Sequence, residues 1–140
     1  METKNIWNDV QNPLELHTDN RGSIVDIFYK SNIEHVAVIN SKPNTLRGNH
    51  YHKQSTQHML MTKGSLEYWY KPANSNEAPQ MILAKEGDMV STFPNEIHAL
   101  VIRGDGNQFV VFSEGVRGGS DYESDTFRVE NIVPEDKMPA

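Results

Sequence analysis

The sequence predicts an all-β domain, either a sandwich or a barrel, built from many short strands. No long segment repeats apolar residues at the i, i+3, i+4 and i+7 spacing of an amphipathic helix. Instead, short runs rich in Val, Ile, Phe, Tyr and Trp recur along the chain, and turn-forming residues separate them. A chain of 140 residues can bury one core without disulfide bonds. We therefore expect a single domain over residues 1–140, with its barrel at about 20–130 and both ends peripheral.

The expected strands follow one another at regular spacing. They cover residues 23–30, 35–40, 48–53, 58–62, 65–71, 80–85, 88–93, 98–104 and 108–115. The sequence GDGN at residues 104–107 predicts a hairpin turn between two apolar strands. The polar segment 71–79 contains two prolines and predicts an exposed loop. We leave open whether the N-terminal residues pair with a partner subunit.

Composition argues against several classes of protein. The net charge is −6 and the basic residues are scattered, so we expect no nucleic-acid partner. No stretch approaches the roughly 20 apolar residues of a membrane-spanning helix. The chain has no cysteine, which excludes disulfides and thiolate metal sites. The sequence begins without the pattern of a secretory signal, so we expect a cytoplasmic location.

The segment RGNHYHKQSTQH, residues 47–58, holds three of the six histidines. Side chains alternate along a strand, so His50 and His52 point to one face and Tyr51 to the other. If that face lines an enclosed barrel, the imidazoles need polar partners. After a short turn Gln57 begins the next strand, close to His52. We interpret the neighbouring His58 as structural.

Two blocks of the sequence resemble the paired motifs of the cupin superfamily. The first block reads His50-Tyr51-His52, four residues, Gln57, six residues and Gly64, and the second reads Gly87, Pro94 and His98. Cupins usually carry Glu where this chain has Gln57. The resemblance implies a single-domain cupin jelly-roll β-barrel, with the imidazoles of residues 50, 52 and 98 converging inside it.

Residues from about 20 to 129 resemble more narrowly the nucleotide-sugar cupins. These include dTDP-4-dehydrorhamnose 3,5-epimerases, dTDP-4-keto-6-deoxyglucose 3,4-ketoisomerases and the cupin domain of capsular polysaccharide reductases. The motifs are DNRG at 19–22 and LRGNH at 46–50. The resemblance implies an isomerase or epimerase that acts on a nucleotide-linked 4-keto-6-deoxy sugar for surface polysaccharide biosynthesis. The 3,5-epimerases carry a tyrosine acid after the second motif, whereas Tyr122 comes late here, which favours a ketoisomerase or single-centre epimerase.

The resemblance also implies roles for individual residues. His50 would remove a proton next to the ketone, and His52 would serve as a second acid or base or as a ligand, because a free histidine titrates near neutrality. Arg21 and Arg47 match positions that hold the nucleotide diphosphate, for which a planar guanidinium is well shaped. One face of the strand around Tyr68 could line the substrate pocket.

The same residues raise the question of a metal. His50, His52, Gln57 and His98 can supply the ligands of one divalent ion, and imidazole suits Zn, Ni or Fe. The capsular reductase cupin binds zinc through HxH, Glu and His, whereas the ketoisomerases and 3,5-epimerases do without metal, so both states stay open. Two other functions also stay open, a metal-dependent dioxygenase or lyase and a non-catalytic sugar-binding cupin. We expect a homodimer, because barrel edges and an apolar outer sheet face favour pairing.

Overall fold

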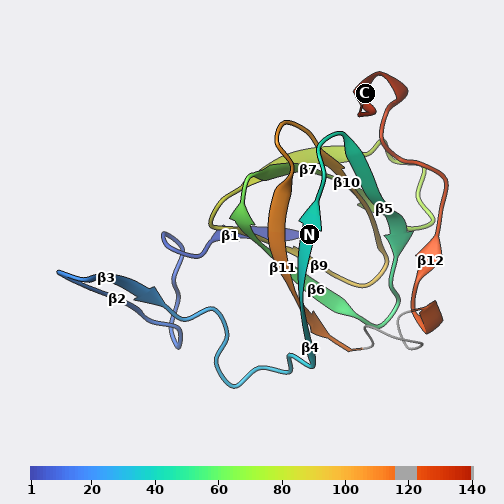
Figure 1. Cartoon of the computed structure of the whole chain (residues 1–140). Helices are drawn as coiled ribbons and strands as arrows, with labels where there is room; N and C mark the ends of the chain where they lie inside the picture. Colours follow the sequence, from blue (N-terminus) through green and yellow to red (C-terminus); the bar gives the residue numbers. More distant parts are fainter. Residues whose placement is uncertain (116–122, 140) are drawn as a thin grey trace.

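Two five-stranded sheets form a barrel, and a separate two-stranded hairpin extends from it (Figure 1). The computed structural model describes residues 1–115 and 123–139. The first sheet has the order β1 (Glu2–Asn5), β9 (Asp88–Thr92), β6 (Thr56–Lys63), β11 (Asn107–Glu114) and β4 (His35–Ser41). The second sheet has the order β12 (Phe127–Arg128), β5 (Thr45–Tyr51), β10 (Glu96–Ile102), β7 (Ser65–Pro72) and β8 (Gln80–Lys85). The hairpin is β2 (Leu16–Asp19) and β3 (Gly22–Val25), and a 3-10 helix, η1 (Glu135–Lys137), lies near the C-terminal end.

The strands of the barrel pair in a nested order. β7 pairs with β8, β6 with β9, β5 with β10 and β4 with β11, and every pair is antiparallel. On each side of the β7–β8 connection, successive strands therefore alternate between the two sheets. This nesting is the jelly-roll topology. The predicted all-β jelly-roll class is confirmed.

The prediction of a hairpin at residues 104–107 is wrong. The strands on either side of this turn, β10 and β11, belong to different sheets, so the turn carries the chain across the barrel. The same holds for the turn after His52, because β5 and β6 also lie in different sheets. Turn residues specify a local change of direction, and they do not show which strand will become the hydrogen-bonded partner.

Three expected segments differ from the structure in their extent. The strand predicted at 23–30 ends at Val25, and the following residues Ile27 and Phe28 pack over the outer face of the first sheet. The strand predicted at 48–53 ends at Tyr51, so His52 follows it. The N-terminal residues, expected at the periphery, supply the edge strand β1, which pairs with β9 of the same chain.

Apolar side chains between the two sheets form the main core. Its fully buried members include Tyr68, Phe109, Met61 and Leu66. Burying an apolar side chain of this size stabilises a fold by roughly 1.5–3 kcal/mol. A second cluster lies around Trp69, next to Tyr68 along β7, and Val133 from the C-terminal segment covers it. Both faces of β7 are therefore buried, which the sequence pattern alone does not reveal.

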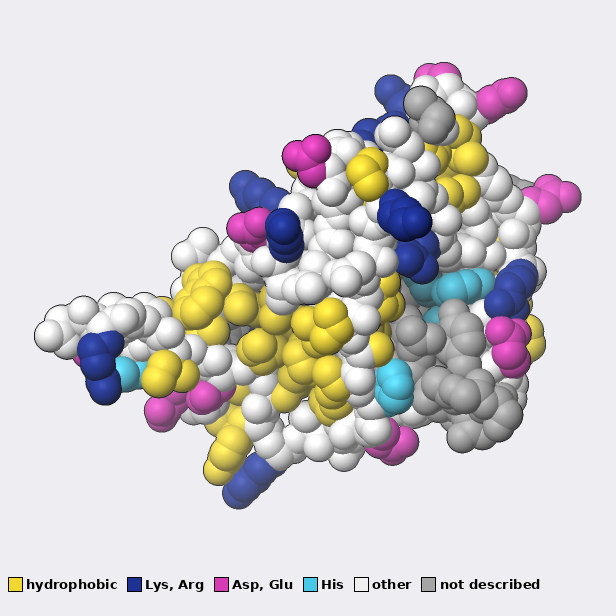
Figure 2. Space-filling view, viewed as in Figure 1, with side chains coloured by type: hydrophobic (Ala, Val, Ile, Leu, Met, Phe, Trp, Pro, Cys, Tyr) yellow, Lys and Arg dark blue, Asp and Glu magenta, His cyan; other side chains and the backbone are white. Residues whose placement is uncertain are grey.

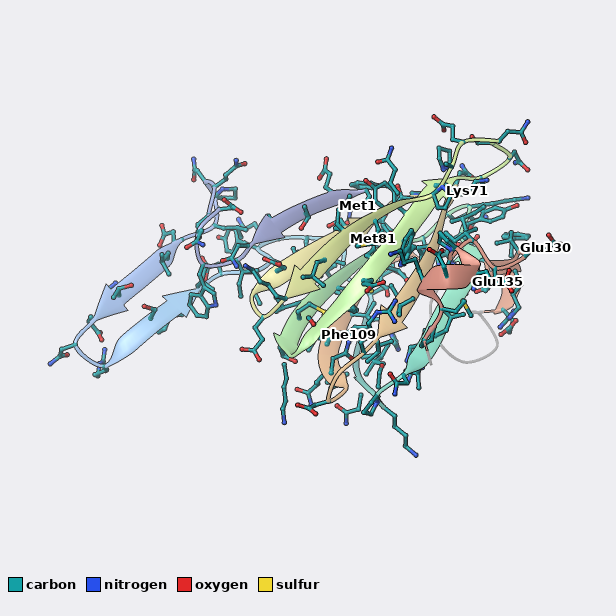
Figure 3. The ribbon with its side chains drawn as sticks, turned by 90° about the horizontal axis from the view of Figure 1, so that it is seen from above. Met1, Lys71, Met81, Phe109, Glu130 and Glu135 are labelled. Atoms are coloured by element: carbon teal, nitrogen blue, oxygen red, sulfur yellow. The ribbon has the colours of Figure 1, made fainter. Side chains whose placement is uncertain are left out.

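The hairpin β2–β3 projects away from the barrel in both views (Figures 1 and 3). Beside it, hydrophobic side chains gather over the outer face of the first sheet (Figure 2). Val36 and Val38, both in β4, are 54% and 63% exposed. The described residues contain no helix that is long and apolar enough to cross a membrane.

Candidate active site

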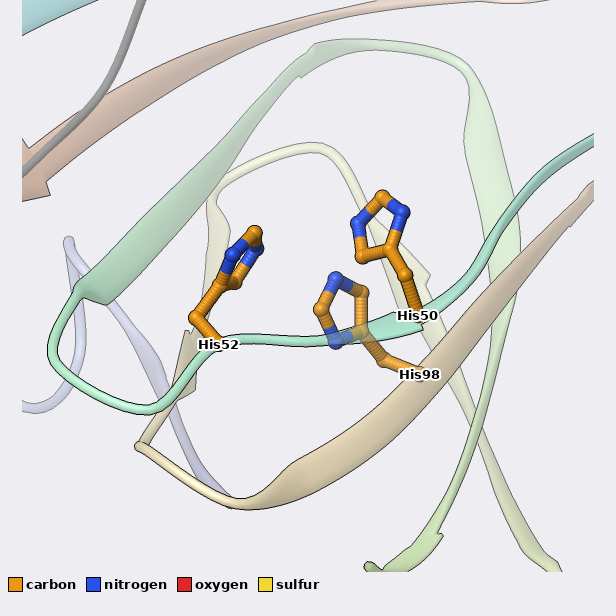
Figure 4. Close-up of side chains that lie close together, drawn as sticks. All are labelled: His50, His52 and His98. Carbon is orange, nitrogen blue, oxygen red and sulfur yellow. The ribbon is translucent and has the colours of Figure 1, made fainter. Parts of the chain in front are cut away.

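Three histidines converge inside the barrel (Figure 4). One ring nitrogen from each of His50, His52 and His98 lies within 4.8 Å of the others. The ring centroids of His50 and His98 are 4.7 Å apart, and those of His50 and His52 are 5.0 Å apart. His52 and His98 are buried, whereas His50 is half-buried. The structure thus brings together the three histidines that the sequence motifs single out.

The pairing of β5 with β10 sets two of these histidines side by side. His98 lies opposite His50 in the register, and a bulge interrupts the ladder between His98 and Ala99. The bulge depends on Gly48, whose φ is +88°. A Cβ at this glycine would lie 2.7 Å from the carbonyl oxygen of His98. Glycine is therefore required both for the backbone conformation and for the close approach of the two strands.

Main-chain carbonyls fix the tautomers of the two buried rings. Nδ1 of His52 lies 2.8 Å from the carbonyl oxygen of Asp125, and Nδ1 of His98 lies 3.2 Å from that of Glu96. A carbonyl oxygen can only accept, so Nδ1 carries the proton in both rings. In the neutral ring, Nε2 therefore bears the lone pair. Histidines that ligate metals are commonly held in this way.

The environment keeps His98 neutral. The pKa of His98 is lowered to about 3, chiefly by burial and also by the neighbouring rings of His50 and His52, although the hydrogen bond to the Glu96 carbonyl acts in the opposite direction. At neutral pH this ring is consequently an uncharged imidazole. It can offer a lone pair from Nε2, but it is too weak a base to hold a proton.

A cavity of about 160 Å³ opens onto the cluster. Its polar lining residues are Arg47, His50, Gln57 and His98, and the remaining lining is Gly48 and apolar side chains. Gln57 reaches the cavity from β6 in the facing sheet, where its side chain is buried. The exposed Arg47 is held in place by Ser41 Oγ at 2.9 Å and by the carbonyl of Asn40 at 3.0 Å.

The structure places Tyr68 behind the cluster and outside the cavity lining. Its ring is fully buried and stacks parallel to His98, at 6.1 Å between centroids. Its hydroxyl lies 2.6 Å from Thr92 Oγ1 and donates to Glu96 Oε1 at 2.9 Å. Burial and the Glu96 charge raise the pKa of Tyr68 well above its usual value. This residue supports His98 by packing and has no surface to offer a ligand.

Arg21 and His58 lie away from the cavity. Arg21 is at the turn of the projecting β2–β3 hairpin, where its side chain is 83% exposed and pairs with Asp19 at 2.7 Å. His58 is in β6, where its two ring nitrogens contact Ser91 and Glu114. Figure 1 shows how far the hairpin extends from the barrel. Within this chain, therefore, Arg21 is not part of the site.

Asp125 is a site neighbour that the sequence did not indicate. It is separated from His52 by 73 positions, yet its carbonyl holds the His52 ring and its carboxylate binds the loop that follows. The segment lies within the residues that resemble nucleotide-sugar cupins, but the resemblance assigned Asp125 no role. Tyr122, considered above as a late tyrosine, lies outside the described residues.

A closed jelly-roll barrel with an imidazole cluster in its interior defines this protein as cupin-like. The chain belongs to the polysaccharide biosynthesis C-terminal domain family, whose sequence model matches residues 17–117. A search of curated proteins finds no match.

Several solved structures share the fold. A 3,4-ketoisomerase from Helicobacter canadensis is 20% identical, with a TM-score of 0.69 over 92% of each chain. ChmJ, a 3'-monoepimerase from Streptomyces bikiniensis solved in complex with dTDP-quinovose, is 15% identical, with a TM-score of 0.68 over 91% of this chain and 75% of ChmJ. The capsular polysaccharide assembling protein CapF from Staphylococcus aureus is 21% identical, with a TM-score of 0.63, and the match covers 86% of this chain and 34% of CapF.

Proposed function

We propose that this protein is an isomerase or epimerase that acts on a nucleotide-linked 4-keto-6-deoxy sugar in polysaccharide biosynthesis. The observation that carries the proposal is the half-buried His50, which lines a cavity beside the neutral His98. The family and the activities of two structural neighbours, a 3,4-ketoisomerase and a 3'-monoepimerase, support the same reaction class.

The size of the cavity suits one sugar ring. Pockets that enclose a whole drug-sized ligand measure about 300–1,000 Å³, and this cavity measures about 160 Å³. A nucleotide-linked sugar can therefore place only its sugar here, and the diphosphate and nucleoside must lie outside. Arg47 is exposed and lines the same cavity, so its guanidinium is positioned to meet the diphosphate.

His50 is the best candidate for the base. The low pKa of His98 makes it a very weak base, and His52 does not line the cavity. In the proposed step, a C–H bond next to the ketone breaks, its proton moves to a ring nitrogen of His50, and the electron pair forms an enediolate. Protonation of the same carbon from the opposite face by a second acid inverts the centre, and His50 then gives its proton to solvent. Delivery of the proton to the former carbonyl carbon moves the ketone, because the hydroxyl proton on the neighbouring carbon passes to the former carbonyl oxygen. Neither outcome adds or removes atoms, so no redox partner is needed.

The histidine cluster also fits a divalent metal. Two nitrogens bound to tetrahedral zinc at about 2.0–2.1 Å lie about 3.4 Å apart, so nitrogens within 4.8 Å need only a modest contraction. His50, His52 and His98 would hold the ion, with Gln57 as the oxygen ligand. When bound, such an ion would polarise a ketone oxygen. Because a ligating His50 cannot also take the proton, metal content decides the role of this residue.

The three-histidine cluster equally favours a second candidate, a metal-dependent cupin such as a dioxygenase or lyase. Elemental analysis of the purified protein separates the candidates. Stoichiometric iron supports the dioxygenase, whereas zinc or nickel is compatible with the isomerase. A protein that binds nucleotide sugars but turns over none of them would be a sugar-binding cupin.

We also propose a homodimer, formed through the outer face of the first sheet. Val36 and Val38 are more than half exposed on that face, and exposed apolar patches of this kind mark interaction surfaces. Arg21, which points away from its own barrel, can then contact substrate only in the site of a second subunit. Light scattering should show a dimer, and the pair Val36→Asp and Val38→Asp should make it monomeric. Leu83→Asp, an equally exposed position on β8, is the control and should leave the dimer intact.

Hydrogen exchange tests the reaction directly. The protein is incubated in D₂O with dTDP- or GDP-linked 4-keto-6-deoxyglucose, with and without added metal. Solvent deuterium should enter the sugar next to the ketone, and His50→Gln should slow this entry by about 10²–10⁴-fold. His58→Gln, outside the cavity, is the matched control and should exchange normally. If no deuterium enters either sugar under any condition, the proposed function is wrong.

A further inference from the structure

Asp125 makes two separate sets of contacts with one stretch of chain. Its carboxylate accepts hydrogen bonds from the main-chain N–H groups of Lys53, Gln54 and Ser55, at 3.0–3.3 Å, and from the hydroxyl of Ser55 at 2.9 Å. Its main-chain carbonyl accepts from Nδ1 of His52 at 2.8 Å. One residue therefore binds four consecutive residues that carry the chain from the histidine strand to the opposite sheet.

The carboxylate contacts anchor the carbonyl contact. Asp125 lies before β12, whose ladder begins at Phe127, so strand pairing does not fix its position. The side chain is almost fully buried, with 4% of the residue exposed. Burial would raise the pKa of Asp125, but the hydrogen bonds from Lys53, Ser55 and Gln54 outweigh burial and hold the pKa below its usual value. The carboxylate is thus a charged acceptor at neutral pH, well suited to several N–H donors.

We infer that Asp125 is the positioning residue of the site, fixing the orientation and the Nδ1–H tautomer of His52. The carboxylate locks residue 125 onto the 53–55 loop, and this lock keeps the adjacent carbonyl in line with the His52 ring. Asp125 is not among the residues that line the cavity. Asp125 acts only through His52. Any effect of Asp125 on catalysis therefore rests on the proposed function, whereas its effect on the His52 tautomer does not.

Chemistry predicts that asparagine cannot replace this aspartate. Both carboxylate oxygens face donors, with Lys53 N–H on Oδ1 and the Ser55 N–H and hydroxyl on Oδ2. An amide keeps one acceptor oxygen and turns the other position into an NH₂ donor. In Asp125→Asn, a donor must therefore face a donor, whichever way the amide is turned. Glu123→Gln is the matched control, because it removes a carboxylate from the same segment, where Glu123 pairs with the exposed Arg128.

Long-range ¹H–¹⁵N correlation spectra of the histidine side chains, recorded on metal-free protein, test the inference. In the wild type, His52 and His98 should both show the Nδ1–H tautomer. In Asp125→Asn, His52 should lose the single tautomer while His98 keeps it, and Glu123→Gln should match the wild type. An unchanged His52 in a folded Asp125→Asn protein overturns the inference.

A wild-type measurement covers the case in which Asp125→Asn does not fold. The amide protons of residues 53–55 lie outside any strand, yet they should exchange slowly because Asp125 accepts from them. Fast exchange of all three, or an Nε2–H tautomer of His52, overturns the inference without any variant. If the isomerase activity requires a metal held by His52, Asp125→Asn should lower kcat by about 10–100-fold and leave KM nearly unchanged. Absence of activity in the wild type refutes the proposed function alone, because the spectra are still interpretable.

Discussion

Gly48 offers a quantitative test of how the β5–β10 register builds the site. In Gly48→Ala, the new methyl group would lie 2.7 Å from the carbonyl oxygen of His98 and 3.2 Å from Cα of Ala99. Both contacts are with backbone, which cannot rotate away. A left-handed conformation costs an alanine about 1–2 kcal/mol, and overpacking costs about 1–3 kcal/mol more. We therefore expect unfolding free energy to fall by about 2–5 kcal/mol.

Gly104→Ala is the matched control for this measurement. Gly104 also has a positive φ, +59°, but nothing lies within 4 Å of a Cβ built there. This variant should lose only the conformational part, about 1–2 kcal/mol. Urea unfolding of both variants gives the steric contribution as their difference. If the two variants lose the same stability, the close approach of β5 and β10 at Gly48 is not as described, and neither is the bulge that sets His50 beside His98.

Three further predictions concern the cluster and its support. The pKa of His98 lies below that of an unfolded histidine, so the unfolded state binds more protons between about pH 6.5 and 3. The free energy of unfolding should therefore have its full His98 contribution above pH 6.5 and fall as the pH drops through this window. Urea titrations at several pH values should show this dependence in the wild type and a flatter one in His98→Gln. Tyr68→Phe should lower unfolding free energy by about 1–3 kcal/mol, since Glu96 and Thr92 lose a buried partner, and a change under about 0.5 kcal/mol would contradict that network. Zinc at a hundredfold excess over its Kd should stabilise the wild type by about 2.7 kcal/mol in thermal unfolding. His52→Gln should abolish this stabilisation, and the control His58→Gln should keep it. No stabilisation of the wild type by zinc, nickel or iron would argue against a metal site.

The spacing of the motifs was sufficient to predict that the three histidines converge, because the fold requires that spacing. His50 and His98 occupy adjacent, hydrogen-bonded strands of the second sheet, and the glycines of the two motifs, Gly64 and Gly87, lie at turns between strands. The sequence did not reveal which strands pair with one another. Alternating apolar residues look the same whichever sheet a strand joins, so the crossover at residues 104–107 was mistaken for a hairpin.

Side-chain environment was the other part that the sequence could not supply. Tyr68 lies in the core between the sheets, and Trp69 on the other face of β7 is also buried because Val133 of the C-terminal segment covers it, which no local pattern shows. Arg21 belongs to a recognisable motif, yet its hairpin leaves the barrel. Asp125 reaches His52 through tertiary contacts over 73 positions, a distance at which a single sequence carries no signal.

The nested pairing has a consequence for how the chain folds. Closing a loop costs more entropy as the loop lengthens, so β7 and β8 should meet first and the β6–β9, β5–β10 and β4–β11 pairs should close after them, from the inside outward. The His50–His98 contact belongs to the third of these pairs. Substitutions on β7 or β8 should therefore slow refolding, whereas those on β4 or β11 should mainly accelerate unfolding. The candidate active site would then form late in folding, after most of the strands have paired.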